Sequence, residues 1–205
     1  MTIWKAILKI LNKINKKRKL SKYNDFTISE YFRKQEVRVG KDNRIEIRSF
    51  GPEPYLVKIG NHCTIGPNVA FLTHDGGTWL FTEEVPDLQK FGTIEIRDNC
   101  FLGSSVIVLG DVCIGPNSIV GAGAVVTKDV PPNVVAAGNP AEIICGIEEY
   151  QKKVFKKWEL QKPDKYFNGI KREKRYSPAD IQKYKNSDLL ILRNHLEKTL
   201  WNKSN

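Results

Sequence analysis

The sequence predicts an all-β core in which short parallel strands wind into a three-sided coil, a β-helix, with helical extensions at both ends. Two observations predict this fold. An aliphatic residue recurs at every sixth position, and glycines or Gly-Pro-Asn turns recur in the same frame. A period of six matches neither a helix, with 3.6 residues per turn, nor a simple strand, with two. It suits a chain that makes a short strand, turns a corner and repeats.

The repeat is clearest between residues 96 and 130. Its first interior positions are all aliphatic: Ile96, Leu102, Val108, Ile114, Val120 and Val126. Four residues after each of these lies a small or apolar residue: Cys100, Val106, Val112, Ser118, Ala124 and Val130. Glycine follows the aliphatic residue at Gly103, Gly115 and Gly121, where it permits a tight corner and close approach of neighbouring coils. Stacked coils would line up both sets as ladders inside the coil.

The same frame extends toward the N-terminus through Ile59, Ile65 and Phe71, and it predicts a coil domain over residues 37–146. Ile47 fits the frame, but Glu53 at the next step weakens that coil. Phe71 and Ile96 are not separated by a multiple of six. An insertion over residues 74–93 is therefore predicted to interrupt the repeat.

Two segments resemble known acyltransferases. Residues 121–140, GAGAVVTKDVPPNVVAAGNP, resemble the end of the repeat domain in galactoside and maltose O-acetyltransferases. Residues 59–69, IGNHCTIGPNV, followed by Thr73-His74-Asp75, are similar to xenobiotic and polysaccharide acetyltransferases. The resemblance implies a left-handed parallel β-helix of hexapeptide repeats and a homotrimer with active sites between subunits. It also implies that acetyl-CoA is the co-substrate.

His74 is the predicted general base. It lies where the repeat breaks into the inserted loop, so it stands at a corner of the coil, and enzymes of this superfamily carry their catalytic histidine at this kind of position. A neutral imidazole suits the task because its pKa lies near the operating pH. His62, on a corner or outer face, and His195, in a predicted tail helix, are weaker candidates. By resemblance to the galactoside enzymes, Ser104 and its N–H are the candidate oxyanion donor.

The coenzyme groove is also carried over by resemblance. The residues at the corresponding spacing are Phe101, Gly103, Ser104, Gly121, Ala122, Thr127 and Lys128. Gly121 and Gly123 would allow close approach, and Lys128 can meet a phosphate. Cys145 stands where those enzymes place an arginine. The adenine or phosphate end is therefore expected to meet a different group, such as a lysine or arginine of the tail.

The inserted loop is expected to shape the acceptor site. Trp79 offers a flat apolar face of the kind on which sugars stack, and Asp75 can bond hydroxyl groups or orient His74. Other loop acids could do the same: Glu83, Glu84 and Asp87. Packing on a neighbouring subunit is the alternative role for Trp79 and Phe81.

The leading functional prediction is O-acetylation of a sugar hydroxyl, in the synthesis of a bacterial surface polysaccharide. Antibiotic O-acetylation and amino-sugar N-acetylation are enzymatic alternatives that the same base would serve. A non-catalytic scaffold is the alternative outside enzymes. A γ-type carbonic anhydrase shares the fold but needs three zinc-binding histidines, and only His62 and His74 lie in the coil, so no metal is expected.

The N-terminal 22 residues form a basic amphipathic segment. They carry eight Lys or Arg and no acid, within a chain of net charge +10. Residues 2–15 have helical spacing. One side is apolar: Trp4, Ile7, Leu8, Leu11 and Ile14. The other is largely basic: Lys5, Lys9, Lys13 and Lys16. Two interpretations stay open, which are packing on the enzyme's own trimer and peripheral contact with an anionic membrane.

No secretory signal, spanning helix or nucleic-acid signature is recognised, so a cytoplasmic enzyme is expected, at the inner membrane face under the second interpretation. Four cysteines without metal-site spacing are interpreted as reduced apolar residues: Cys63, Cys100, Cys113 and Cys145. Residues 147–205 are predicted to form a basic, helical extension that packs on the coil or trimer. It comprises a helix over 147–160, a linker from Pro163 to Arg175, and a helix that opens at Ser177-Pro178.

Overall fold

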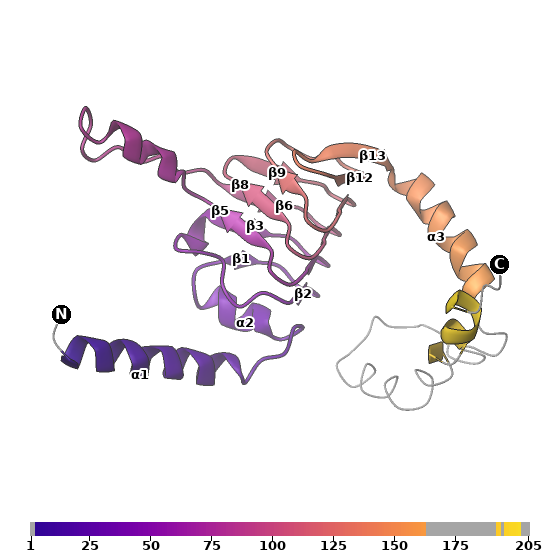
Figure 1. Cartoon of the computed structure of the whole chain (residues 1–205), viewed down its shortest axis with the longest axis horizontal. Helices are drawn as coiled ribbons and strands as arrows, with labels where there is room; N and C mark the ends of the chain where they lie inside the picture. Colours follow the sequence, from indigo (N-terminus) through magenta and orange to yellow (C-terminus); the bar gives the residue numbers. More distant parts are fainter. Residues whose placement is uncertain (1–2, 163–191, 194, 202–205) are drawn as a thin grey trace. The chain divides into compact units, whose positions relative to one another are not determined.

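The structure is a computed structural model, and it describes residues 3–162, 192–193 and 195–201 (Figure 1). Residue contacts divide the chain into two units, residues 1–148 and 149–205, and each is considered by itself. The first unit holds all the strands that the structure describes. The predicted linker and most of the predicted C-terminal helix lie outside the described residues.

Short strands of the first unit form three sheets (Figure 1). Sheet A contains β1 (Arg38–Val39), β3 (Val57–Ile59), β6 (Ile94–Ile96) and β9 (Val112–Ile114). Sheet B contains β2 (Arg44–Ile45), β4 (Thr64–Ile65), β7 (Phe101–Leu102), β10 (Ile119–Val120), β12 (Val134–Ala137) and β13 (Glu142–Gly146). Sheet C contains β5 (Ala70–Leu72), β8 (Ile107–Leu109) and β11 (Val125–Val126). All neighbours pair in parallel except β12 and β13, which pair antiparallel.

From β3 to β11 the chain visits sheets A, B and C in rotation. The strand register shows the length of one rotation. Ile96 is paired with Ile114, in sheet A. Val120 is paired with Leu102, in sheet B. Each partner therefore lies three hexapeptides away, which confirms that the six-residue period describes one side of a three-sided repeat.

The interior ladders are as predicted. The aliphatic series from Ile96 to Val126 is almost completely buried, and so is the second series from Cys100 to Val130. Ser118 is the polar member of the second series, and its hydroxyl donates to the carbonyl of Pro131 at 2.8 Å. A buried polar group costs little when it is paired in this way. Ile47 is also buried, so the repeat frame extends that far toward the N-terminus.

One corner of the coil is built from stacked amide side chains. His62, Asn99, Asn117 and Asn133 all have positive φ, between 56° and 62°. Asparagine tolerates this left-handed backbone better than most residues. The Nδ2 of Asn99 donates to Oδ1 of Asn117 at 2.9 Å, and the Nδ2 of Asn117 donates to Oδ1 of Asn133 at 3.1 Å. The Nδ1 of His62 meets Oδ1 of Asn99 at 2.6 Å, so the predicted corner position of His62 is confirmed.

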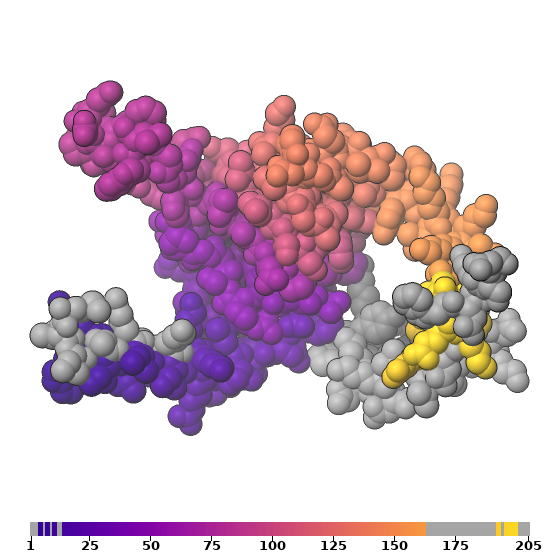
Figure 2. Space-filling view, in the orientation of Figure 1, coloured from indigo at the N-terminus to yellow at the C-terminus, as the bar shows by residue number. Residues whose placement is uncertain are grey.

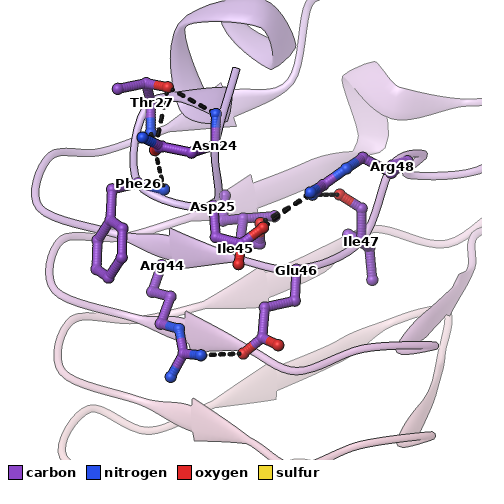
Figure 3. A network of polar contacts seen from close by, with 9 residues as sticks. All are labelled: Asn24, Asp25, Phe26, Thr27, Arg44, Ile45, Glu46, Ile47 and Arg48. Carbon is purple, nitrogen blue, oxygen red and sulfur yellow. Dashed lines mark hydrogen bonds and ion pairs between the residues drawn. The ribbon is translucent and has the colours of Figure 1, made fainter. Parts of the chain in front are cut away.

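The N-terminal end of the coil is covered by α2 (Ile28–Arg33). Phe32 of this helix is buried, and its ring packs edge-on against Phe50, which stacks on Phe71. The turn before the helix is fixed by polar contacts (Figure 3). The side chain of Asn24 accepts from the N–H groups of Phe26 and Thr27, each at 3.0 Å. The apolar end of the coil is thereby kept from water.

Of two further helices, one precedes the strands in the sequence and the other follows them. Helix α1 (Ile3–Leu20) is longer than the predicted residues 2–15. Helix α3 (Ile147–Gln161) confirms the predicted helix after the repeat. Short 3-10 helices η1 (Pro54–Leu56) and η2 (Gly76–Phe81) lie in loops, and a short π-type turn, η3 (Glu197–Trp201), lies near the C-terminus. No helix in the described part of the chain is long and apolar enough to cross a bilayer.

Candidate active site

His74 lies two residues after the end of β5, at the base of the inserted loop. The two ends of the loop are joined by backbone hydrogen bonds. The N–H of Asp75 donates to the carbonyl of Lys90 at 3.0 Å, and the N–H of Gly92 donates to the carbonyl of Thr73 at 2.8 Å. The imidazole is held on a short, bonded segment, although 44% of the side chain is exposed. An exposed ring on a fixed backbone is accessible to a substrate.

Glu53 holds the His74 ring. The Nδ1 of His74 lies 3.0 Å from Oε2 of Glu53, and the hydroxyl of Thr73 donates to the same oxygen at 2.6 Å. Because an ionised carboxylate can only accept, the proton of a neutral His74 must sit on Nδ1. Nε2 is then the free acceptor, which is the state that a general base needs.

The electrostatics keep Glu53 ionised. The hydrogen bond from the Thr73 hydroxyl, and after it the bond from His74, lowers the pKa of the Glu53 carboxyl below its ordinary value. The Glu53 side chain is only 14% exposed, so these two donors replace much of its water. The carboxylate is therefore charged at any pH at which His74 works as a base.

The loop acids do not take the place of Glu53. Asp75 instead accepts from the N–H of Gly77 at 2.9 Å and pairs with Lys90 at 3.2 Å. These two contacts also lower the pKa of Asp75, the Gly77 bond being the stronger cause. Asp75 thus caps η2 and braces the loop. The acid that orients His74 is Glu53, which belongs to an earlier coil. In the sequence, the only sign of it is that it interrupts the aliphatic repeat.

The rest of the loop presents apolar side chains to solvent. Trp79 is 78% exposed, and Leu80 and Phe81 beside it are exposed as well. In Figure 2 the loop projects from the strands, at the upper left. Both predicted roles of Trp79, stacking on a sugar and packing on a second subunit, need such a projecting ring.

Ser104 and Ala122 lie at the corner between sheets B and C, in successive coils. The two coils approach so closely that a Cβ added to Gly103 would lie 2.6 Å from the N of Ala122. A Cβ on Gly121 would likewise lie 2.9 Å from the Cβ of Ala137. The close stacking of the coils by itself requires glycine at both positions.

This corner offers a free backbone hydrogen-bond donor. The N–H groups of Gly103 and Ser105 donate to carbonyls at 2.8 and 2.9 Å. That of Ser104, between them, has no acceptor among the residues that the structure describes. Phe101, on the outer face of β7, exposes its ring just before this corner. An exposed N–H next to an apolar ring suits an extended ligand that carries amide and carbonyl groups.

The other predicted coenzyme residues lie elsewhere. Thr127 and Lys128 follow β11, so they lie at the far end of sheet C, which is also the end where His74 follows β5. Strands β5 and β8 run in parallel with Ala70 opposite Ile107. His74 and Ser104 consequently stand at opposite ends of the strands of sheet C. One copy of the chain does not bring the predicted base and the predicted oxyanion donor together.

Two of the cysteines, Cys63 and Cys100, are unsuited to nucleophilic catalysis. All four are free, and Cys63 and Cys100 are buried. Burial raises the pKa of Cys63 to about 12 and also raises that of Cys100, so neither forms a thiolate near neutral pH. Within the described ranges, no three His, Cys, Asp or Glu side chains gather closely enough to hold a metal ion.

Comparisons with known proteins agree on the repeat. Residues 93–128 match the family model described as "Bacterial transferase hexapeptide (six repeats)". The chain is 44% identical to Protein CapG of Staphylococcus aureus over 137 residues, which is 65% of this chain and 80% of CapG.

It is also 47% identical to a galactoside O-acetyltransferase of Lactococcus lactis, over 42% of this chain and 41% of the relative. The chain thus spans less than half of that enzyme's length. Among solved structures, a galactoside acetyltransferase in complex with coenzyme A is 34% identical, with a TM-score of 0.47, over 57% of this chain and 58% of that one.

Proposed function

Because the chain belongs to the hexapeptide-repeat acetyltransferase family and is an acetyltransferase, we propose that it transfers the acetyl group of acetyl-CoA to a sugar hydroxyl, with His74 as the general base. The pairing of His74 with Glu53 carries this proposal. It fixes the ring and its tautomer, and it leaves Nε2 unprotonated beside the loop.

The proposed reaction is a direct transfer. Nε2 of His74 takes the proton of the acceptor hydroxyl as its oxygen attacks the thioester carbonyl carbon. The N–H of Ser104 stabilises the negative charge that develops on the carbonyl oxygen. The intermediate then collapses, the carbon–sulfur bond breaks, and the sulfur takes the proton from the imidazolium. The products are the acetyl ester and CoA with a free thiol.

The site requires more than one copy of the chain under this proposal. His74 and Ser104 lie at opposite ends of sheet C, so a neighbouring subunit must supply one of them. We propose a closed left-handed β-helix over residues 37–146 that assembles as a trimer. In such a trimer, the His74 end of sheet C in one subunit would face the Ser104 end of sheet C in its neighbour. The exposed ring of Trp79 and the carboxylate of Asp75 would then border the acceptor.

The donor groove is the second part of the proposal. The Ser104 corner meets the thioester end of acetyl-CoA and its pantetheine amides. The groove includes Gly103, Gly121 and Ala122, and Thr127 and Lys128 meet the phosphate end. Because these residues occupy both ends of sheet C, an extended donor must lie along the coil or reach a neighbouring subunit. No metal ion takes part in the proposed reaction.

The proposed acceptor is a sugar, since the relatives with named acceptors include galactoside O-acetyltransferases. We extend this to the synthesis of a bacterial surface polysaccharide in the cytoplasm. Release of free thiol from acetyl-CoA, measured with sugars, nucleotide-sugars, amino sugars and antibiotics, tests the acceptor. Turnover restricted to antibiotics or to amines would replace the proposal with the corresponding alternative. Absence of coenzyme binding would favour a scaffold.

The test of the base compares His74→Ala with His62→Asn. Both changes remove an imidazole, but asparagine at position 62 continues the corner ladder and suits its positive φ. We expect His74→Ala to lose about 100-fold or more in turnover, the usual contribution of a general base. His62→Asn should retain wild-type turnover. Equal activity of His74→Ala and wild type would assign the base elsewhere.

The two-copy site has a separate test. His74→Ala is mixed with Ala122→Trp, whose bulky ring blocks the donor groove, and the two are co-assembled. If each site takes His74 from one subunit and the groove from the next, random mixing restores about one quarter of the sites. If one copy holds the complete site, mixing restores no activity.

A further inference from the structure

Helix α1 leaves an apolar face uncovered. Its exposed large apolar residues recur at helical spacing: Trp4, Ile7, Leu8, Ile10, Leu11 and Ile14. Trp4 is 78% exposed and Leu8 is 57% exposed. Apolar residues three and four positions apart share one side of a helix. A stripe of this size on water is unfavourable, so something is expected to cover it.

The charge of the segment indicates which kind of surface would bind the apolar face of α1. Residues 1–22 contain eight Lys or Arg and no acid. Lys5 and Lys16 are exposed, lie three helical turns apart and share a side of the helix away from the centre of the apolar stripe. The last turn adds Lys17, Arg18 and Lys19. A second copy of this helix would oppose like charges, whereas a surface of lipid phosphates neutralises them.

The dimensions of the helix suit a membrane surface. Its 18 residues carry an apolar stripe rather than an apolar circumference, so it can lie in an interface but cannot span one. Leu20, at its end, packs against the core of the coil. Asn24 and Asp25 then tie the following turn to the chain, and Asp25 pairs with Arg48 at 2.8 Å (Figure 3). A bound helix would therefore hold the enzyme close to the surface.

We propose that α1 is an interfacial helix that docks the enzyme on a membrane containing anionic phospholipid. The face with Trp4, Leu8 and Leu11 enters the boundary between headgroups and acyl chains. The lysines meet headgroup phosphates. This inference is independent of the acyl acceptor and of the identity of the base.

The test is co-sedimentation of the full chain with vesicles of phosphatidylcholine alone, or with roughly one third phosphatidylglycerol. We expect binding to the anionic vesicles only, weakened by added salt. Leu8→Gln with Leu11→Gln removes apolar surface while keeping charge and helix propensity, and should weaken binding at least about tenfold. Lys16→Gln with Lys17→Gln should weaken it about 25-fold, at about fivefold per lysine.

The matched control is Lys152→Gln with Lys156→Gln, which removes the same charge from exposed positions on α3. This control should bind as the wild type does. A blue shift of tryptophan emission on binding, lost in Trp4→Phe, would place the helix in the lipid. Acetyl transfer to a soluble acceptor should be unchanged in the α1 variants.

Three results would overturn the proposal. The first is the absence of wild-type binding to anionic vesicles. The second is an equal loss in the α3 control, which would indicate attraction by net charge alone. The third is a change of oligomeric state in Leu8→Gln with Leu11→Gln while vesicle binding persists, which would show that α1 packs on a second copy.

Discussion

Replacing Glu53 by glutamine would isolate the contribution of its charge to the base. Oε2 of Glu53 accepts from both Thr73 and His74, and a glutamine carbonyl oxygen can accept from both in the same place. The charge is lost while both hydrogen bonds to this oxygen can be kept. Hydrogen bonds to a charged group are worth about 1 to 2 kcal/mol more than neutral ones. If the imidazolium of the transition state loses this additional stabilisation, kcat/KM falls about 5- to 30-fold.

The assay is thiol release at saturating acceptor, with KM for acetyl-CoA measured alongside. Glu53→Gln should lower kcat and leave KM for acetyl-CoA unchanged, because Glu53 orients His74 and is not placed in the donor groove. Glu53→Ala should lose more activity, since the His74 ring is then no longer held in place. Activity within about twofold of wild type in both variants would refute the positioning role. Thermal unfolding of each variant separates this effect from a folding defect.

The remaining predictions concern stability. Thr73→Val removes the larger cause of the lowered Glu53 pKa, so that pKa should rise. Stabilisation by Glu53 is present above its unfolded pKa, about 4.3, and is lost as pH falls through the folded value. In Thr73→Val this loss should begin at higher pH in acid unfolding. Leu102→Ala, in the completely buried ladder, should lower the free energy of unfolding in urea by about 2 to 5 kcal/mol. Asn117→Ala should cost about 2 to 3 kcal/mol from two lost hydrogen bonds and positive φ, and Asn117→Gly less, since glycine relieves the φ strain. Equal loss in the two variants would contradict the strain argument.

The repeat could be predicted because each coil repeats the same physical requirement. Every sixth residue must fill an interior ladder, so Ile96, Leu102 and Val108 report one environment three times. The parallel pairing follows from that pattern, since equivalent residues of successive coils must stack. The corner asparagines were less visible. Their positive φ and side-chain ladder show only when successive coils are superposed.

The candidate site was only half visible in the sequence. His74 could be found because it borders the break in the repeat. Its partner Glu53 lies in the coil below, and only pairing between coils brings it within 3.0 Å of His74. Glu53 drew attention as a misfit at an expected interior position. A polar residue that breaks a strict repeat is therefore a sign of a site as well as a sign of a weak coil.

The same geometry explains why the acceptor is hard to deduce from the sequence. Interior positions such as Ile114 are constrained by stacking and carry no information about ligands. Positions at the corners, such as Ser104, are freer, because only their backbone is used by the coil. The loop that carries Trp79 has no counterpart in the other coils, so nothing in the repeat constrains its side chains. Under the proposed function, acceptor choice would therefore rest on the segment that the repeat describes least, and on the neighbouring subunit that would face it.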